Sequence, residues 1–503
     1  MSASTKNPTT FDIVIVGAGI SGINAAYRLQ TQLPGSTYTI LEARGAIGGT
    51  WDLFRYPGVR SDSSMHTLGF SWRPWKDAKT MVGGEAIREY LQDSARENGI
   101  DGHIQFKRKL VAADWESEQQ AWRLKVDAEG ETEYFSGRFL ILGTGYYDYA
   151  NTFPASIPGI ESFGGAVIHP QFWPQDLDYA DKKVVIIGSG ATAVTLLPEL
   201  TKKAAHVTMI QRSPSYIASQ PSVDPIKAKL LRWFPWLPYG WIYRLTRWRS
   251  LIMGYLFLRS CQKNPDTFKK LLIAKAAEQL PSTIPVEPHF TPVYNPWEQR
   301  LCASPDGDFY AALRTGNAHV VTGTIESVTA DGILVSPATT GSSPSESDVM
   351  FPADIIIVAT GLQLQMAGGA TLSVDGSPVA IGQQFWWKGA LLQDVPNMAL
   401  TFGYTSLSWT LGVDATALLV CRILKYMRRR GMTSVVPRMK ENERNLKLLP
   451  ALNLSSTYIK RNGHAFPKCG GRAPWRPRTN YLWDVFEALW GSLGDGLEFR
   501  TVS

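Results

Sequence analysis

The chain has little cysteine. Its 503 residues include four cysteines, Cys261, Cys302, Cys421 and Cys469. No two of them form a C-x-x-C pair, and such wide spacing is typical neither of a zinc site nor of a disulfide framework. We therefore expect no metal ion and a protein that stays reduced, for which a cytoplasmic location is the simplest interpretation.

Long apolar runs are also lacking. No stretch approaches the roughly 18 apolar residues that a membrane-spanning helix needs, and the polar segment Met1–Thr10 lacks the pattern of a signal peptide. The net charge is +7, but no recognised nucleic-acid-binding module accompanies it, so we expect no nucleic acid as a partner. A solvated basic surface is the simplest interpretation of the charge. Attraction of an anionic cofactor and weak peripheral membrane contact are the alternatives.

What the chain does have is apolar material for more than one core. Hydrophobic residues make up 44% of it and charged residues 19%, which is an ordinary globular composition. At typical domain sizes, this length predicts two or three domains. The Ser- and Pro-containing stretch at 341–347 is typical of a surface turn or loop.

The first informative pattern is a dinucleotide-binding fingerprint near the N-terminus. The β-branched run Asp12–Val16 predicts a buried parallel strand, and it leads into G-A-G-I-S-G at 17–22. A predicted helix and a second strand, Tyr38–Leu41, follow. Glu42 then stands 20 residues after Gly22, where a carboxylate can accept hydrogen bonds from ribose hydroxyls. The unit is typical of FAD binding, with the pyrophosphate at the helix N-terminus. The predicted turn contacts are Gly17, Gly19, Ser21 and Gly22.

The same pattern recurs later in the chain with one difference. Lys183–Ile187 predicts a strand, G-S-G-A-T-A at 188–193 the turn, and a helix follows to about Leu200. The next strand, His206–Ile210, leads into Gln211 and Arg212 instead of an acid. A carboxylate there would repel a 2′-phosphate, whereas an arginine would pair with it, so this unit is typical of NADPH binding. The predicted contacts are Gly188, Ser189, Gly190, Ala191, Thr192, Ala193, Val194, Gln211 and Arg212.

Two such units predict an α/β protein with two Rossmann-like dinucleotide-binding domains, one for FAD and one for NADPH. Apolar runs before glycine turns at 139–145 and 355–361 are interpreted as the crossings between the two domains. The FAD domain is then split in sequence. The predicted divisions are 1–150 for its first part, 151–350 for the NADPH domain with a helical insertion at about 222–290, and 351–503 for the second part of the FAD domain with a C-terminal tail.

Two longer motifs carry a family resemblance. Residues 163–174 match F-x-G-x-x-x-H-x-x-x-W-P, and residues 48–62 match [AG]-G-x-W-x4-[FY]-P-[GM]-x3-D. In both, the chain resembles the type I Baeyer–Villiger monooxygenases, whose fingerprint the first motif is. It most resembles the bacterial ethionamide-activating branch of that family. That resemblance extends over nearly the whole chain, in stretches such as Tyr294–Cys302 and Pro474–Arg476.

The resemblance implies a reaction. The family uses FAD, NADPH and O2 to place one oxygen atom in a ketone, giving an ester or lactone, or in a thioether, giving a sulfoxide, through a C4a-peroxyflavin. The flavin carries the difficult chemistry, and the protein supplies binding, orientation and charge. A small-molecule ketone or thioether is the implied substrate, and no protein partner is implied.

The resemblance also assigns residues. It places a permanently charged donor at Arg300 and its carboxylate partner at Asp62. From the residues alone, Arg300 would be a surface arginine and Asp62 a turn residue. Many relatives have a lysine just before this arginine, whereas this chain has Gln299, which leaves a 2′-phosphate to Arg212 and Ser213. The implied FAD contacts are Thr50, Trp51, Asp52, Leu53, Asp62 and Val111. The implied NADPH contacts are Arg60, Ser61, Asp62 and His169, the last in a structural and coupling role.

Segment 225–280 is helical, basic and rich in aromatic residues. We interpret it as a helical insertion that lines the substrate mouth, with peripheral membrane contact as the alternative.

Other functions are weighed against the same residues. A flavin disulfide reductase needs a close cysteine pair, which the sequence lacks. A non-enzymatic NADPH sensor would not need Asp62 and Arg300. An S- or N-oxygenating flavin monooxygenase that acts mainly on sulfides stays as the alternative, although Trp173, Pro174 and Arg300 favour the Baeyer–Villiger class.

Overall fold

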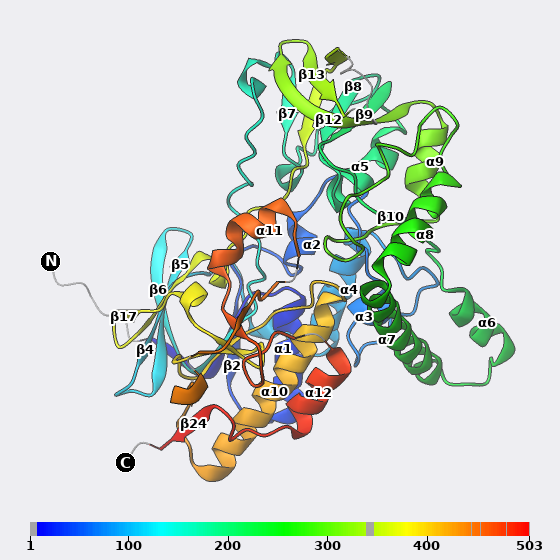
Figure 1. Ribbon diagram of the computed structural model, residues 1–503. Coiled ribbons are helices and arrows are strands. Elements are labelled where there is room, and N and C mark those ends of the chain that lie inside the picture. The colour runs from blue at the N-terminus through cyan, green and yellow to red at the C-terminus, as the bar shows by residue number, and fades with distance from the viewer. Residues whose placement is uncertain (1–7, 339–346, 444, 453, 479, 502–503) are drawn as a thin grey trace.

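Two sheets organise the chain, and the strands of one interrupt those of the other in sequence. The computed structural model describes residues 8–338, 347–443, 445–452, 454–478 and 480–501. The first sheet takes its strands from residues 9–142 and again from 371–400, whereas the second takes its strands from 166–358. In Figure 1 the second sheet lies above the first. Residues 341–346 of the expected surface loop lie outside the described residues.

The first sheet is built around β1 (Thr9–Val16). This strand runs parallel to β2 (Tyr38–Leu41) on one side and to β6 (Glu131–Leu142) on the other. β20 (Met398–Leu400) pairs in parallel with β6 from far along the chain. The sheet therefore needs residues from both ends of the sequence. Its other strands are β3 (Ile104–Gln105), β4 (Lys109–Glu116), β5 (Ala121–Ala128), β16 (Thr371–Val374), β17 (Ser377–Pro378), β18 (Trp386–Trp387) and β19 (Leu391–Leu392).

Helices from the two ends of the chain cover this sheet together. The long helix α10 (Trp409–Arg430) packs against α1 (Ile20–Gln32), and α12 (Tyr481–Trp490) packs on α10. Asp414 of α10 is almost fully buried and forms an ion pair with Arg28 of α1 at 2.9 Å. The remaining helices of this part are α2 (Thr50–Leu53), α3 (Met65–Leu68), α4 (Gly84–Glu97) and α11 (Thr457–Asn462).

The second sheet is a second parallel unit. β8 (Lys183–Ile187) lies between β9 (His206–Gln211) and β15 (Ile355–Val358), parallel to both. α5 (Ala191–Leu200) and α9 (Asp308–Arg314) pack into the apolar core on one face. The predicted α/β fold with two dinucleotide-binding units is confirmed. The other strands are β7 (Ala166–Ile168), β12 (Ala318–Thr329), β13 (Gly332–Pro337) and β14 (Val349–Pro352).

The end of the second sheet differs from the predicted division. We expected the FAD domain to resume at residue 351, but β15 belongs to the second sheet, where it pairs with β8 and β7. An apolar run such as Ile355–Val358 fits a central parallel strand of either sheet, so its periodicity alone cannot assign it. The crossing back to the first sheet therefore follows β15 instead of preceding it.

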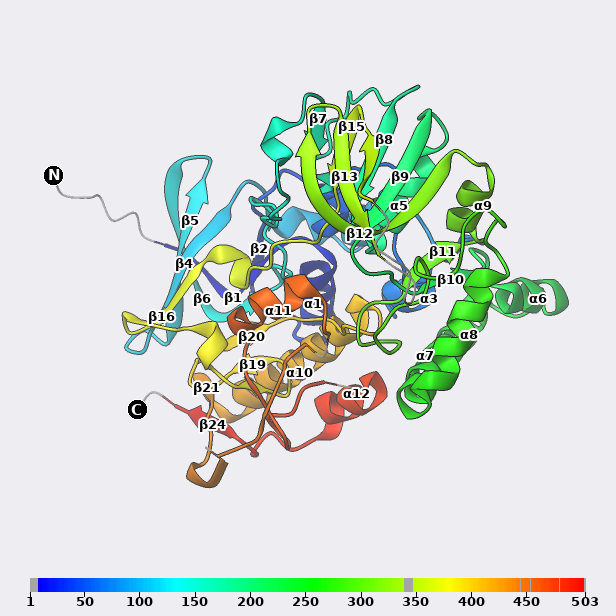
Figure 2. The same ribbon diagram turned by 45° about the horizontal axis from the view of Figure 1, so that its top comes forward.

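The helical insertion projects from one side of the molecule (Figures 1 and 2). It consists of α6 (Pro225–Trp233), α7 (Tyr239–Lys263) and α8 (Pro265–Ala277). The short parallel pair β10 (Ile217–Gln220) and β11 (Cys302–Pro305) brings the two ends of the insertion together at its base. Within the described residues, no helix is long and apolar enough to cross a membrane.

The first glycine turn depends on close backbone contact. Gly17 has a φ of +101°, a conformation that a side chain disfavours. A Cβ added at Gly22 would lie 1.8 Å from the carbonyl oxygen of Gly17, and one at Gly17 would lie 2.7 Å from that of Gly143. These contacts let α1 begin directly at the end of β1.

We predict that Gly22→Ala destabilises the protein by about 3 kcal/mol, at the upper end for overpacking, because the clash is with backbone. Urea unfolding measures the change. Gly102→Ala is the matched control, since nothing lies within 4 Å of an added Cβ there, and its effect should stay within about 0.5 kcal/mol. Equal unfolding midpoints for the two variants would contradict the close-contact account.

Candidate functional site

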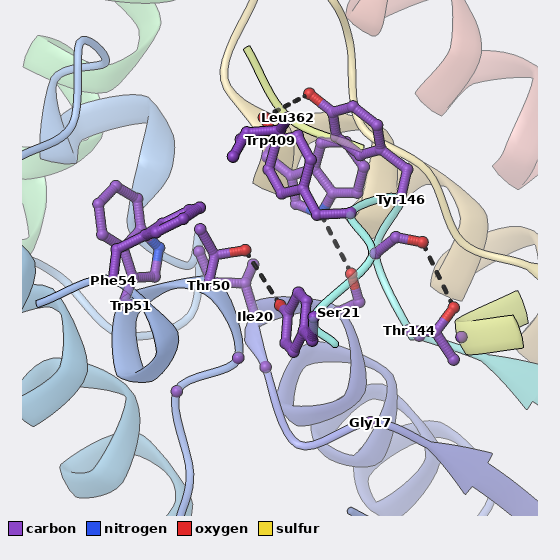
Figure 3. A pocket seen from close by; sticks show the side chains of 18 of the residues that line it. Gly17, Ile20, Ser21, Thr50, Trp51, Phe54, Thr144, Tyr146, Leu362 and Trp409 are labelled. Carbon is purple, nitrogen blue, oxygen red and sulfur yellow. Dashed lines mark hydrogen bonds between the residues drawn. The ribbon is translucent and has the colours of Figure 1, made fainter. Parts of the chain in front are cut away.

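One cavity of about 520 Å³ lies where the two units face each other. The first unit contributes the turn after β1 and the segment around α2, and the second contributes the start of α5. Figure 3 shows the wall made by Gly17, Ile20 and Ser21 together with Thr50 and Trp51. Of the expected residues, the lining includes Gly17, Gly19, Ser21, Glu42, Thr50, Trp51, Arg60, Ser61, Asp62, Ala191, Thr192 and Arg300.

The N-terminus of α1 opens into this cavity. Gly19 is its N-cap residue and offers no side chain to the free amides of the first turn. The Ser21 hydroxyl accepts a hydrogen bond from Trp409 Nε1 at 3.1 Å, as Figure 3 shows. Free amides and the helix dipole together make a site that suits an anionic group.

Glu42 lies at the end of β2 and is buried. Its carboxylate accepts hydrogen bonds from the backbone N–H of Ala18 at 2.6 Å and of Arg44 at 2.8 Å. Burial raises the pKa of Glu42, and these two donors oppose the increase. The carboxylate is thus fixed in place on the cavity wall and keeps lone pairs to accept further hydrogen bonds.

Arg300 and Asp62 lie in the same cavity. The Arg300 side chain is exposed to the open space of the cavity, and its Nη2 donates a hydrogen bond to the Tyr146 hydroxyl at 3.0 Å. Tyr146 raises the pKa of Arg300, against the effect of burial, so this residue is a permanent cation. Burial raises the pKa of Asp62 to about 6, and the charges of Arg300 and Arg60 oppose that increase. The cavity therefore holds two cations around one carboxyl group.

Arg60 connects the two units. Its guanidinium forms an ion pair with Asp308, the first residue of α9 in the second unit. Ser304 also donates a hydrogen bond to Asp308, at 2.8 Å, which holds that carboxylate in place. Among the described residues, the buried Nε of Arg60 has no hydrogen-bond partner. Arg60 thus joins the cavity wall to the second unit and keeps donor capacity.

An aromatic cluster that the sequence patterns did not reveal closes the Arg300 side of the cavity. The ring of Tyr146 stacks on that of Trp409, with centroids 5.2 Å apart and an angle of 16°. The Tyr146 and Tyr147 hydroxyls lie 2.9 Å apart. Both tyrosines follow the glycine turn after β6, which was interpreted only as a domain crossing. Their place directly after a strand that ends at the cavity is the signal that could have identified them.

The second glycine turn contributes only its end to the cavity. Ala191 and Thr192 line it, whereas Gly188, Ser189, Gly190, Ala193 and Val194 do not. The Ser189 hydroxyl donates to the carbonyl of Ser213 at 2.9 Å. The Gln211 side chain is buried and donates to His289 O and Thr322 Oγ1, so it points into the domain core. Arg212 is exposed and donates to Thr457 Oγ1 at 3.1 Å.

Some expected FAD contacts lie outside the cavity. Asp52 is buried in ion pairs with Arg44 and Arg55, both at 2.7 Å, and Leu53 packs in the core of the second unit. Gly22 is covered by the backbone of Gly17.

Val111, which the family resemblance assigned to FAD, is not among the residues that line the cavity. Its side chain is 39% exposed, and Arg108, Lys109 and Leu110 line the cavity instead. The register of β4 against β5 shifts between Leu110 and Ala112. Such a bulge breaks the alternation from which a side chain's direction is predicted.

His169 does not line the cavity either. It precedes the short turn after β7, and its Nδ1 accepts a hydrogen bond from the backbone N–H of Gln171 at 3.3 Å. Burial lowers the pKa of His169. Among the described residues, its buried Nε2 has no partner. A neutral ring with one unused donor, at the edge of the second sheet, suits a structural or coupling position better than direct catalysis.

Comparisons with known proteins agree on one family. A family model described as flavin-binding monooxygenase-like matches residues 11–228. The FAD-containing monooxygenase EthA of Mycolicibacterium smegmatis is 45% identical, with 94% of each chain covered. The protein of that name from Mycobacterium tuberculosis is also 45% identical, with 97% of each chain covered.

Solved structures match in fold. An oxidized steroid monooxygenase bound to NADP has a TM-score of 0.74 at 20% identity and covers 98% of this chain and 100% of its own. Cyclohexanone monooxygenase from Rhodococcus sp. Phi1 bound to NADP+ has a TM-score of 0.71 at 20% identity, with 99% and 100% covered.

We predict that Asp52→Asn destabilises the protein by about 3 kcal/mol, because it leaves the arginines around a buried carboxylate without their partner. Urea unfolding measures the change. Glu85→Gln is the control. Glu85 pairs with Arg55 and with Arg88, which also lies 3.7 Å from Asp52, but Glu85 is 57% exposed, so its loss should change stability by less than about 1 kcal/mol. If Asp52→Asn proved as mild as the control, Asp52 would not be the group that holds these arginines in place.

Proposed function

We infer the reaction from the family: this chain belongs to the FAD-containing, flavin-binding monooxygenases. We propose that it binds FAD and NADPH and, with O2, converts ketones to esters or lactones and thioethers to sulfoxides. The observation that carries this proposal is the placement of Arg300 and Asp62 in one cavity with the first glycine turn. The relatives' names support FAD, and the titles of the similar solved structures support NADP.

The residues at the first turn fit FAD. The amides at the start of α1 are free and face the cavity, as the pyrophosphate requires. The carboxylate of Glu42 is fixed by hydrogen bonds on the cavity wall, where it would accept hydrogen bonds from the ribose hydroxyls. Ser21 lies in the turn that would hold the phosphates. The close backbone contacts at Gly17 and Gly22 leave no room for a side chain at either position of the turn. Thr50 and Trp51 would contact the flavin from α2.

The second turn and its arginine suit NADPH. Ala191 and Thr192 bring the start of α5 to the cavity, and Arg60 and Ser61 face them from the first unit. Arg212 makes a single side-chain hydrogen bond among the described residues, to Thr457. A guanidinium has five donors, so most of its capacity is left for a 2′-phosphate. Gln299 in place of the relatives' lysine leaves this role to Arg212, with Ser213 beside it.

Arg300 would stabilise the charge that develops during oxygen transfer. When bound, FAD would supply the oxidising chemistry by taking electrons from NADPH and reacting with O2. Attack on a ketone places negative charge on its carbonyl oxygen, and a fixed cation in a cavity with little water stabilises that charge more than water does. Tyr146 holds the guanidinium by a hydrogen bond, and Asp62 provides the opposite charge. The stacked rings of Tyr146 and Trp409 exclude water on this side.

A second candidate function keeps the same cofactors. An S- or N-oxygenating flavin monooxygenase that acts mainly on sulfides would not need a cation beside a carbonyl oxygen. Arg300 therefore favours the Baeyer–Villiger reaction, and product analysis separates the two.

The test is product analysis with FAD-loaded protein, NADPH and a panel of linear ketones, cyclic ketones and aryl thioethers. We expect esters or lactones from ketones. Arg300→Ala should keep FAD and still be reduced by NADPH, but should lose at least about 100-fold in ester formation, the effect of removing one charge-stabilising donor.

Tyr146→Phe is the matched control for this variant. It keeps the cation and removes one hydrogen bond to it, so ester formation should fall by roughly tenfold at most. Sulfoxide as the sole product of the wild-type protein would favour the second candidate function. Full ester yield from Arg300→Ala would refute the role of Arg300.

Ester formation should also depend on pH through Asp62. Its pKa is raised to about 6, so the carboxylate is ionised above that pH and protonated below it. Protonation removes the charge that holds Arg60 and Arg300, and the rate should fall as the pH drops through 6. Asp62→Asn should lower the rate at pH 8 by about tenfold and abolish this acidic limb. Asp331→Asn, at an exposed turn, is the control and should leave the profile unchanged. An acidic limb that persisted in Asp62→Asn would assign it to another group.

A further inference from the structure

The helical insertion carries an apolar stripe that no described residue covers. Along α7, Trp241, Leu245, Trp248, Ile252 and Leu256 are 45–61% exposed. They recur at steps of four, three, four and four residues, which places them on one face of the helix. The stripe extends over about 22 Å at 1.5 Å per residue. The opposite face packs on the protein through buried residues such as Ile242 and Tyr243.

A second exposed apolar face lies next to the stripe. On α12, Trp483, Phe486 and Trp490 are 46–69% exposed and follow one another at helical spacing. The rings of Trp483 and Phe486 stack, with centroids 5.6 Å apart. A groove lined by Tyr255 and Arg259 of α7 and by Trp483 of α12 connects the two helices. Figures 1 and 2 both show α12 on the side of the molecule where α7 projects.

The segment that carries the stripe has charge of one sign. Residues 225–264 contain eight lysines and arginines and no aspartate or glutamate. Three of the cations hold the insertion to the protein. Lys227 donates to Asp77 O, Arg247 donates to the carbonyls of His66 and Gly69, and Arg249 forms an ion pair with Asp224.

The other five cations face solvent. They are Lys229, Arg232, Arg244, Arg259 and Lys263. Among the described residues, none of the five forms an ion pair. Arg244 lies over the ring of Trp241, and Arg259 over that of Tyr255, at 5.7 and 5.9 Å from the centroids. The stripe is therefore flanked by cations that have no acidic partner within the described part of the chain.

We propose that α7, with α12 beside it, docks the protein on the surface of an anionic lipid bilayer. Tryptophan and arginine on one amphipathic element are typical of the membrane interface, where the ring enters the headgroup region and the cation meets lipid phosphate. A second copy of the chain fits less well, because a symmetric contact would bring two sets of unpaired cations together. Nucleic acid fits less well because the Leu and Ile side chains of the stripe cannot form hydrogen bonds or ion pairs with phosphates or bases.

The test is co-sedimentation of the FAD-loaded full chain with vesicles. One set contains equal parts of phosphatidylcholine and phosphatidylglycerol, and the other phosphatidylcholine alone. We expect binding to the anionic vesicles at low salt, weakened by added salt, and little binding to the neutral ones. Arg244→Glu with Arg259→Glu should weaken binding by roughly 25-fold or more, at about fivefold for each cation lost. Leu245→Gln with Trp248→Gln should weaken it at least tenfold.

Matched variants separate docking from general effects. Lys182→Glu with Lys203→Glu changes the net charge equally at exposed sites on the second unit, and Leu448→Gln removes an apolar side chain that is 60% exposed elsewhere. Both should bind as the wild-type protein does. The expected position of the insertion at the substrate mouth is not borne out, since no residue of α6, α7 or α8 lines the cavity. NADPH oxidation in solution and FAD content should therefore be the same in every variant, whatever reaction the enzyme performs.

Three outcomes would overturn the proposal. The wild-type protein could stay in the supernatant with both kinds of vesicle. The Lys182 and Lys203 variant could lose binding as fully as the Arg244 and Arg259 variant, which would assign the effect to net charge. The wild-type protein could also fail to bind vesicles and form a dimer in sedimentation velocity. If Leu245→Gln with Trp248→Gln dissociated that dimer, the stripe would be a contact surface for a second copy of the chain.

Discussion

The arrangement on which the site depends is one carboxyl group between two arginines. The positive charges of Arg60 and Arg300 act on the Asp62 carboxyl group. Each arginine also has a further partner: Arg60 forms an ion pair with Asp308, and Arg300 donates a hydrogen bond to Tyr146. Arg60 comes from the first unit, Asp308 from the second, and Arg300 from the segment that returns from the helical insertion. Electrostatic attraction thus positions three separate parts of the chain around one cavity. Burial strengthens these interactions and also makes an unpaired charge costly, so the members of the group depend on one another.

The parts of the fold that follow local rules could be predicted from the sequence. Three strands have the expected bounds: Tyr38–Leu41, Lys183–Ile187 and Ile355–Val358. Each is a short run rich in apolar or β-branched residues, a pattern that favours a buried strand. The helix that follows the first turn begins at Ile20, inside the G-A-G-I-S-G stretch, since the turn glycines lead straight into it. The assignment of β15 to a sheet could not be predicted, because pairing between distant strands leaves no local pattern.

The residues of the candidate site also divide into those that a local sequence pattern predicts and those that it does not. Residues of the two glycine turns, such as Ser21 and Thr192, could be placed at the cavity because their position follows from chain direction, whereas Thr50 was assigned by the family resemblance. Arg300 and Asp62 came from the family resemblance, and nothing local distinguishes them. Tyr146 and Trp409 were missed, since their contact joins residues that are far apart in sequence. Val111 was assigned by the family resemblance and lies at a bulge in β4, outside the cavity lining, and Asp52 faces arginines that the motif did not reveal.

The split of the first sheet has a consequence for synthesis on the ribosome. β1 and β6 emerge early, but β20 and the helix α10 that covers α1 emerge only after the whole second sheet has been made. The second unit is contiguous and can close its own core while the first still exposes an open edge at β6. The nascent chain therefore completes its inner unit before its outer one. The unit that contains the first sheet stays incomplete until about residue 430 has left the exit tunnel.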